Sequence, residues 1–286
     1  VVMGHILQFD LTGESRNAVF NFIYGFHMPV FMALSGFVVG ISTVGVPKRG
    51  FKRTLLRRIQ QLAIPFFVWG LLVIPLLHHP TNFTGYKDSV INLLLSPDNG
   101  AWFLISLCGI HIAYIVAQWA TLKLNPIIKN SELIKPLIFL ILPLCWKLIT
   151  NVIAPQYRGG GITLYMPLEY AIMFYVGYLL KRNETFCFNA NTFVIVCLIF
   201  ILSIPYYEFS VSPNWYRLIT SIPATIILIN ISNFIVKMWG DNACNVYRSL
   251  ISLGQNSIMV YLLHFLIVGF TLQVIDVSII PSLPLF

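Results

Sequence analysis

The sequence predicts an all-α protein that crosses a membrane several times as a polytopic transmembrane helix bundle. The chain of 286 residues is 57% hydrophobic and only 10% charged, whereas a soluble domain carries about 25% charged residues. The mean hydropathy is +0.80, and several apolar runs reach the ~20 residues that a helix needs to cross the hydrocarbon. The alternating segments typical of a membrane β-barrel are absent. Helices therefore remain as the spanning structure, because each satisfies its backbone hydrogen bonds within one segment.

Apolar runs separated by short loops rich in Pro, Gly and Asn predict nine spans within a single membrane domain covering residues 1–286. The first run is about half the length of a span, and Val1 is not an initiator Met, so we expect part of the first helix to be missing. A further helix could follow the C-terminal "PSLPLF". The expected spans are 1–9 (partial), 18–43, 59–78, 101–121, 134–152, 163–180, 191–207, 215–236 and 255–275.

The net charge of +8 lies in short loops between apolar runs, which indicates membrane orientation rather than nucleic-acid binding, because cytoplasmic loops carry an excess of Lys and Arg. Alternate loops hold most of the basic residues, and we expect these loops to be cytoplasmic. Their basic residues are Lys48, Arg49, Lys52, Arg53, Arg57, Arg58, Lys123, Lys129, Lys135, Lys181, Arg182, Lys237 and Arg248. The other basic residues lie in the opposite loops or within spans: Arg16, Lys87, Lys147, Arg158 and Arg217.

The five cysteines form no CxxC pair, and three of them lie inside apolar runs. We expect them to be small buried side chains rather than disulfides or metal ligands. No metal site is expected.

His5, in "VVMGHILQF", is the first candidate for chemistry, because an ionisable side chain inside an apolar span is costly and is usually functional. Gln8 follows on the same helical face, and Asp10 and Glu14 follow just beyond the helix end. A neutral imidazole near a carboxylate is suited to taking a proton from a hydroxyl. We therefore predict His5, Asp10 and Glu14 as catalytic. The alternative is a histidine that bonds a neighbouring helix for packing alone.

The stretch "FHMPVFMALSGFVVG" begins with His27 and Pro29, and a simple membrane anchor needs neither. Pro29 falls in the first turns of the helix, where proline is tolerated. Ser35 and Gly36 are small enough to let another helix approach closely. We predict that His27 lines a substrate chamber. The alternative is an interfacial histidine at a helix start.

Arg49, Arg53 and Arg57 are spaced four residues apart, so they form one stripe on a helix that enters the membrane near Ile59. Guanidinium groups bind phosphate through paired hydrogen bonds. Basic cytoplasmic loops also serve orientation alone, but six cations within eleven residues exceed that need. We predict that Arg49, Arg53, Arg57 and Arg58 bind a phosphate-bearing ligand.

Polar groups elsewhere in or at the ends of spans indicate a cavity inside the bundle. Glu169 and Arg217 could pair, which would lower the cost of both. The segments "GAWFL" and "YLLH" place aromatic rings beside polar groups, although an interfacial aromatic belt explains the first equally well. Lys147 is another such polar group. The residues assigned to the substrate chamber are His27, Trp102, Glu169, Arg217, Tyr261 and His264.

Taken together, these pieces resemble the acyltransferase 3 family of membrane-bound acyltransferases from Val1 to about Val268. The most specific is "FHMPxFxxLSGF" followed by a basic loop and an Ile-Pro-aromatic helix start. The arrangement is most similar to small, single-domain members that O-acetylate sugars or peptides. The matching segments are "VVMGH", "FHMPVFMALSGF", "RTLLRRIQQLAIPFFVW", "GAWFL", "MPLEYAIMFYVGYLLKR" and "GQNSIMVYLLHFLIV".

The resemblance implies a ten-helix bundle, multi-pass in a bacterial inner membrane. It implies acyl-CoA, usually acetyl-CoA, as a donor substrate from the cytoplasmic side, and no permanently bound cofactor. The acceptor would be a hydroxyl of a cell-envelope glycan or a related molecule. His5 matches the family's catalytic histidine, as a general base or as a transient acyl carrier. The basic loop matches the region that holds the CoA phosphates. Gln60 and Gln61 stand where the family often has the second Arg of an RxxR pattern, so Arg53 and Arg57 could substitute.

Two other classes of function remain open. A transporter or flippase of an envelope intermediate would also place polar groups within spans, but it needs no CoA-sized site and favours paired repeats, which the sequence lacks. A structural subunit would need neither His5 nor the dense arginine loop. The expected partners are acyl-CoA, a hydroxyl acceptor and the lipid bilayer, without nucleic acid.

Overall fold

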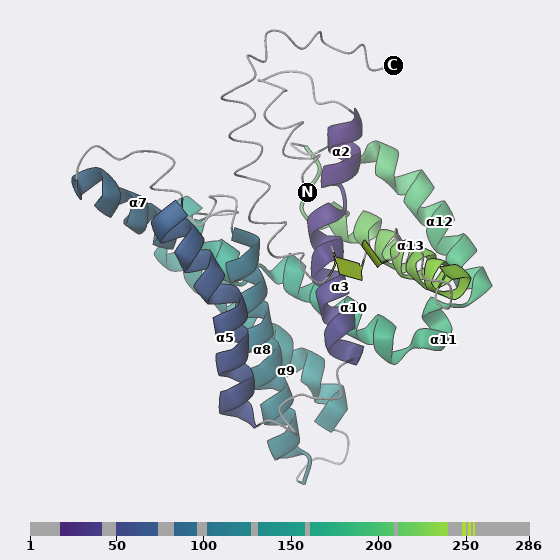
Figure 1. Cartoon of the computed structure of the whole chain (residues 1–286), viewed down its shortest axis with the longest axis horizontal. Coiled ribbons are helices and arrows are strands. Elements are labelled where there is room, and N and C mark those ends of the chain that lie inside the picture. The colour runs from purple at the N-terminus through teal and green to yellow at the C-terminus, as the bar shows by residue number, and fades with distance from the viewer. Residues whose placement is uncertain are drawn as a thin grey trace. The chain divides into compact units, whose positions relative to one another are not determined.

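The computed structural model confirms the all-α class, since the described part of the chain forms helices and no strands (Figure 1). The structure describes residues 18–41, 50–73, 83–95, 102–126, 131–157, 161–208, 211–239, 248, 249, 251, 252 and 254. The α-helices are α2 (Ala18–Tyr24), α3 (His27–Ile41), α5 (Phe51–Val68), α7 (Phe83–Leu95), α8 (Trp102–Leu124), α9 (Ser131–Ile153), α10 (Leu168–Arg182), α11 (Glu184–Cys187), α12 (Ala190–Ser203) and α13 (Tyr216–Trp239). A π-helix, η1 (Trp69–Val73), continues α5, and short 3-10 turns are η2 (Pro155–Tyr157), η3 (Gly161–Tyr165) and η4 (Ile204–Tyr206).

Five helices or joined helices are long and apolar enough to cross a membrane. They match the spans expected at 18–43, 101–121, 134–152, 163–180 and 215–236, and a shorter apolar helix at Ala190–Tyr206 matches 191–207. The span expected at 59–78 corresponds to α5 and η1, of which the described part ends at Val73. The spans expected at 1–9 and 255–275 lie outside the described residues. The five are Ala18–Ile41, Trp102–Leu124, Leu133–Ile153, Gly161–Arg182 and Tyr216–Met238.

The chain divides into two compact units. The first unit is Val1–Val30 with Thr185–Phe286, and the second unit is Phe31–Glu184. In the first unit α12 packs along α13. In the second unit α8 packs against α5, α9 and η3. Most of α8 is buried, as expected for an apolar helix at the centre of its unit.

α5 and α8 run antiparallel, so the start of one helix lies near the end of the other. Phe51, the first residue of α5, lies 5.4 Å from Trp119 near the end of α8, measured between ring centroids. At the other end of α5, Gly70 of η1 lies against the side chain of Leu93 in α7. The start of α5 and the start of α8 are therefore at opposite ends of this unit.

The expectation of close helix packing at Ser35 and Gly36 is confirmed for Gly36 within the second unit. A Cβ atom on Gly36 would lie 1.8 Å from the carbonyl oxygen of Phe174 in α10. A Cβ atom on Gly177 would lie 1.7 Å from the carbonyl oxygen of Ala33 in α3. The backbones of α3 and α10 thus touch directly at two glycines, as small residues permit in membrane helices.

Three local expectations differ from the structure. The loop expected between 78 and 101 contains α7, which buries Leu93 at 2% exposure. The span expected at 18–43 is interrupted by a turn at Gly25–Phe26. The span expected at 163–180 begins with η3, and its α-helix starts only at Leu168, after Pro167. The spans were predicted from the length and hydropathy of apolar runs. Neither quantity indicates where the backbone hydrogen bonds of a helix are interrupted.

Candidate functional site

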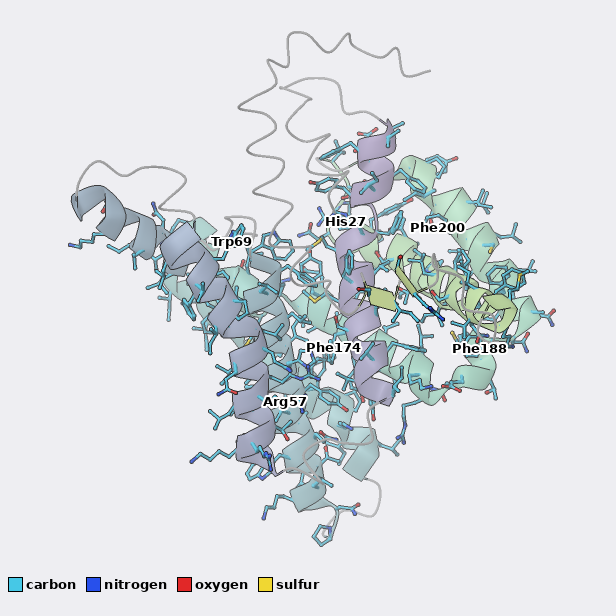
Figure 2. All side chains as sticks on the ribbon, in the orientation of Figure 1. His27, Arg57, Trp69, Phe174, Phe188 and Phe200 are labelled. Carbon is cyan, nitrogen blue, oxygen red and sulfur yellow. The ribbon has the colours of Figure 1, made fainter. Side chains whose placement is uncertain are left out.

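Two members of the predicted arginine stripe, Arg53 and Arg57, lie on one face of α5 and line a pocket of about 750 Å³. Figure 2 labels Arg57 on this helix. Arg53 and Arg57 are both exposed and both line the pocket. Small-molecule pockets usually measure about 300–1,000 Å³, so the volume suits a cofactor-sized ligand. We call it the arginine pocket, and its lining residues are Gly50, Phe51, Lys52, Arg53, Leu56, Arg57 and Gln60.

The start of α5 is favourable for an anion in two ways. Gly50 precedes the helix with a φ of 77°, a conformation that suits glycine, and its carbonyl oxygen accepts a hydrogen bond from Thr54 Oγ1 at 2.9 Å. The first turn carries Lys52 and Arg53 and no acidic residue. Cations at a helix N-terminus oppose the helix dipole. An anionic ligand would interact favourably with both the dipole and the side chains.

Arg58 points to a different face of α5. It is half-buried and donates to Gln61 Oε1 at 3.3 Å, and it does not line the arginine pocket. The structure therefore brings Arg53 and Arg57 together and separates Arg58 from them, while Arg49 lies outside the described residues.

His111 is a buried ionisable residue that the sequence analysis did not single out. Its side chain is 4% exposed, and its ring lies 5.1 Å from the ring of Phe174. Within the described ranges its ring nitrogens make no hydrogen bond. The rule that selected His5, an ionisable group inside an apolar run, would also have selected His111.

Lys135 is also buried, so its assignment to a cytoplasmic loop is wrong. It lies in α9 at 3% exposure and donates to the Tyr178 hydroxyl at 3.1 Å. Its ammonium lies 5.2 Å from the ring centroid of Tyr114 and 4.8 Å from that of Tyr178. The helix begins at Ser131, earlier than hydropathy indicated, because the apolar run starts after the charged first turn.

Two pairs of side chains include residues predicted for the substrate chamber, and both pairs involve the first turn of α10. Trp102 stacks on Tyr170, with ring centroids 5.6 Å apart and an angle of 22° between the planes. Glu169, next to Tyr170 in α10, forms an ion pair with Lys147 of α9, with Oε1 and Nζ 3.3 Å apart. Two of these four residues, Trp102 and Glu169, were predicted for the substrate chamber.

η3 leads into α10 and is hydrogen-bonded to three helices. Ser106 of α8 donates to the carbonyl oxygen of Leu164. Trp146 Nε1 of α9 donates to Ile162 O at 3.0 Å, and the Tyr165 hydroxyl donates to Leu94 O of α7 at 2.9 Å. Irregular backbone at membrane depth needs such partners. These bonds hold the chain just before Glu169.

In the first unit, the turn between α2 and α3 is bonded to α13. Thr220 Oγ1 donates to Gly25 O at 2.5 Å, and Ser221 Oγ lies 3.5 Å from Phe26 O. His27 Nδ1 lies 2.9 Å from Ile23 O. A carbonyl oxygen can only accept, so Nδ1 carries the proton, and in the neutral ring Nε2 carries the lone pair.

Arg217 belongs to the same part of the first unit. Its Nε donates to the Tyr207 hydroxyl at 2.9 Å, and Tyr207 is 1% exposed. A Cβ atom on Gly25 would lie 3.1 Å from the Tyr207 ring. Tyr207 therefore connects Arg217 to the turn that precedes His27. The predicted Glu169–Arg217 pair stays a prediction, because the two residues lie in different units and each has another polar partner.

The remaining predicted site residues lie outside the described residues, and their roles stay predictions. They are His5, Asp10, Glu14, Arg49, Tyr261 and His264.

Comparison with known proteins gives one match along the whole chain and two partial ones. The model of the acyltransferase 3 family, described as an acyltransferase domain, matches residues 1–286. Two proteins named nodulation protein NolL are similar over a short segment. The one from Sinorhizobium fredii is 36% identical over 77 residues, which is 26% of this chain and 20% of that protein. The one from Mesorhizobium japonicum is 35% identical over 78 residues, with the same shares. No solved structure matches.

Proposed function

Since the chain belongs to the acyltransferase 3 family and is a membrane acyltransferase, we propose that it moves an acyl group, with acetyl expected, from acyl-CoA to a hydroxyl of a cell-envelope glycan or related acceptor. The arginine pocket is the observation that carries this proposal. The donor has a diphosphate and a 3′-phosphate. A pocket with three exposed cations at a helix start offers charge, paired hydrogen bonds and a favourable dipole to such groups.

The reaction needs no redox partner. The acceptor oxygen attacks the thioester carbonyl carbon, a C–O bond forms, and the C–S bond breaks. The hydroxyl proton leaves the acceptor, and the CoA thiolate takes up a proton as it departs. A base near the acceptor oxygen accelerates such a step by about 10²–10⁴-fold.

His5 is the proposed base or transient acyl carrier, and the two roles remain alternatives. His27 is proposed to line the chamber. The hydrogen bond that Nδ1 donates to Ile23 O orients its ring at the start of α3. Asp10 and Glu14 complete the proposed catalytic set.

The test is acetyl-CoA binding to purified protein in detergent, by calorimetry at low and high salt. We expect Arg53→Gln/Arg57→Gln to weaken binding by tenfold or more, because each lost charged contact contributes about 1.5–3 kcal/mol. S-acetylpantetheine, which lacks the diphosphate and the 3′-phosphate, should bind the wild type and this double variant equally. Arg182→Gln, an exposed cation at the end of α10, is the matched control.

If acetyl-CoA binding were insensitive both to salt and to the double substitution, the arginine stripe would serve membrane orientation alone. No acetyl-CoA binding by well-folded wild type would remove the donor proposal and favour transport of an envelope intermediate.

A further inference from the structure

One side of α5 is exposed from its basic first turns to its apolar end. Arg53 and Arg57 begin this side, and Gln60, Ile64 and Val68 continue it. At about 100° per residue, these five side chains fall within about 80° of one another around the helix. The buried residues of α5 lie on its other side, where the helix packs against α8. We call the five residues the exposed face of α5.

The arginine pocket, at one end of this face, lies where lipid headgroups are expected. Trp119 of α8 is 42% exposed, and its ring contacts Phe51 at the start of α5. Lys123 follows in the last turn of α8. Tryptophan and lysine side chains anchor membrane helices at the interface between hydrocarbon and water. The helix ends around the pocket are therefore expected at the membrane surface, on the side predicted to be cytoplasmic.

The apolar part of the exposed face has the length of one lipid monolayer. Ile64 and Val68 are 51% and 47% exposed. The 11 residues from Arg57 to Val68 correspond to about 17 Å along the helix, and half of the ~30 Å hydrocarbon is about 15 Å. A lipid with its phosphate in the pocket would thus lay its acyl chains along Ile64 and Val68.

The charges of the pocket favour an anionic lipid over a zwitterionic one. Lys52, Arg53 and Arg57 are exposed cations, and the first turn of α5 has no acidic residue. Guanidinium groups bind a phosphodiester through paired hydrogen bonds, and the helix dipole adds to the attraction. Basic pockets at the cytoplasmic surface bind phospholipid headgroups in this way. A choline headgroup would bring a further cation among these three.

We propose that the exposed face of α5 binds one anionic phospholipid of the cytoplasmic leaflet, with its phosphate in the arginine pocket, and that this lipid competes with acetyl-CoA. The lipid site is independent of the proposed function, whereas the competition rests on it. Both ligands would use the guanidinium groups of Arg53 and Arg57, so each excludes the other. The lipid composition of the membrane would then regulate donor affinity.

The first experiment is native mass spectrometry of the full chain in detergent, titrated with dioleoylphosphatidylglycerol or dioleoylphosphatidylcholine. The two lipids share their acyl chains and differ in headgroup charge. We expect phosphatidylglycerol to bind about tenfold more tightly, as for one contact with a charged group. Arg53→Gln/Arg57→Gln should abolish this preference. Arg182→Gln, an exposed cation at the end of α10, should keep it.

Photochemical labelling locates the lipid. Phosphatidylglycerol with a diazirine in its acyl chain should label residues 61–68 of α5 more strongly than α9, although Leu137 and Ile141 of α9 are 64% and 53% exposed. The matching phosphatidylcholine probe should label the two helices alike. The double arginine variant should lose the enrichment on α5, because the headgroup no longer holds the chains there.

Displacement tests the competition. Acetyl-CoA should release one phosphatidylglycerol molecule per protein, and S-acetylpantetheine, which lacks the phosphates, should release none. Glycerol 3-phosphate has a phosphate but no acyl chains, and it should release none at the same concentration. The detergent sample has no charged bilayer that could repel acetyl-CoA, so release reports a shared site.

Equal binding of the two lipids would overturn the lipid site, and so would a preference that survives the double substitution. Release by glycerol 3-phosphate would assign the pocket to free phosphates rather than lipid. A dimer with an unlabelled α5 would assign the face to a second copy. Acetyl-CoA binding that leaves the lipid in place would overturn the competition alone. A wild type that binds phosphatidylglycerol but no acetyl-CoA would overturn the donor proposal and retain the lipid site.

Discussion

Lys135 and His27 are single side chains whose partners fix what they can do. Lys135 is enclosed by two tyrosine rings and bonds a phenol oxygen, which lowers the cost of a buried cation. His27 donates from Nδ1 to a backbone carbonyl, which selects its tautomer. Both bonds can be removed by isosteric changes, so both roles can be measured.

Tyr178→Phe removes the hydroxyl that accepts from Lys135 and leaves the ring in place. We expect a loss of about 1.5–3 kcal/mol in the free energy of unfolding, because the bond is to a charged group in the interior. Thermal unfolding in detergent measures it. Tyr206→Phe, at 77% exposure, should leave the midpoint unchanged. Equal midpoints for the two variants would show that the Tyr178 hydroxyl contributes nothing.

His27→Asn keeps an N–H group that can bond Ile23 O and removes Nε2. We expect kcat to fall about tenfold or more, as it does when a side chain that takes part in proton transfer is removed. Acetyl-CoA affinity and thermal stability should remain near those of the wild type. Steady-state kinetics with the binding assay separate these effects. If the variant kept the wild-type kcat, His27 would have only a structural role at the start of α3.

At the scale of elements, α3 and α10 leave no room for added side-chain atoms at the two glycines where their backbones touch. Gly36→Ala or Gly177→Ala would place a methyl group within 2 Å of a backbone oxygen of the other helix. The helices must separate to admit it, and overpacking of this kind costs about 1–3 kcal/mol or more. We expect a lower yield of monodisperse protein and a lower unfolding midpoint, measured by size-exclusion chromatography and a thermal scan.

Gly254→Ala is the control for both substitutions, because nothing lies within 4 Å of a Cβ atom there. If the alanine variants of Gly36 and Gly177 matched it in yield and midpoint, the direct backbone contact would be contradicted.

Hydropathy predicted most of the described long helices, because length and apolarity are what a bilayer requires. It missed α7, whose sequence is too polar for a span and whose helix is supported by Leu93 packing on Gly70. It also missed the turn at Gly25–Phe26, because the carbonyls freed there accept from Thr220 and Ser221, far along the chain. Tertiary partners of this kind leave no local signal.

At the scale of the whole molecule, the sequence predicted a group of arginines for ligand binding but not which of them line the pocket. Helical spacing places Arg53 and Arg57 on one face, and the structure keeps them there. Arg58 is one residue further, and the 100° turn per residue carries it toward α8. Pairing of Lys147 with Glu169 could not be predicted, since it depends on how α9 and α10 pack.

Orientation in the membrane can be tested with single cysteines in a cysteine-free background. Lys52→Cys at the start of α5 should react with an impermeant maleimide only after cells are permeabilised, because the basic loop is expected to be cytoplasmic. Lys87→Cys in α7 should react in intact cells. Both positions are exposed. Labelling of both from the same side would contradict the expected topology.

The arginine pocket is built from one continuous segment, residues 50–60. Its cations therefore keep their relative positions through helical phase alone, independent of distant folding. An alanine inserted between Leu55 and Leu56 would rotate Arg57 by about 100° away from Arg53, while leaving the number of cations and the net charge unchanged. A four-residue insertion at the same point would nearly restore the phase, about 40° beyond a full turn. Donor affinity should follow the angle rather than the number of cations, which makes the pocket a site encoded by spacing.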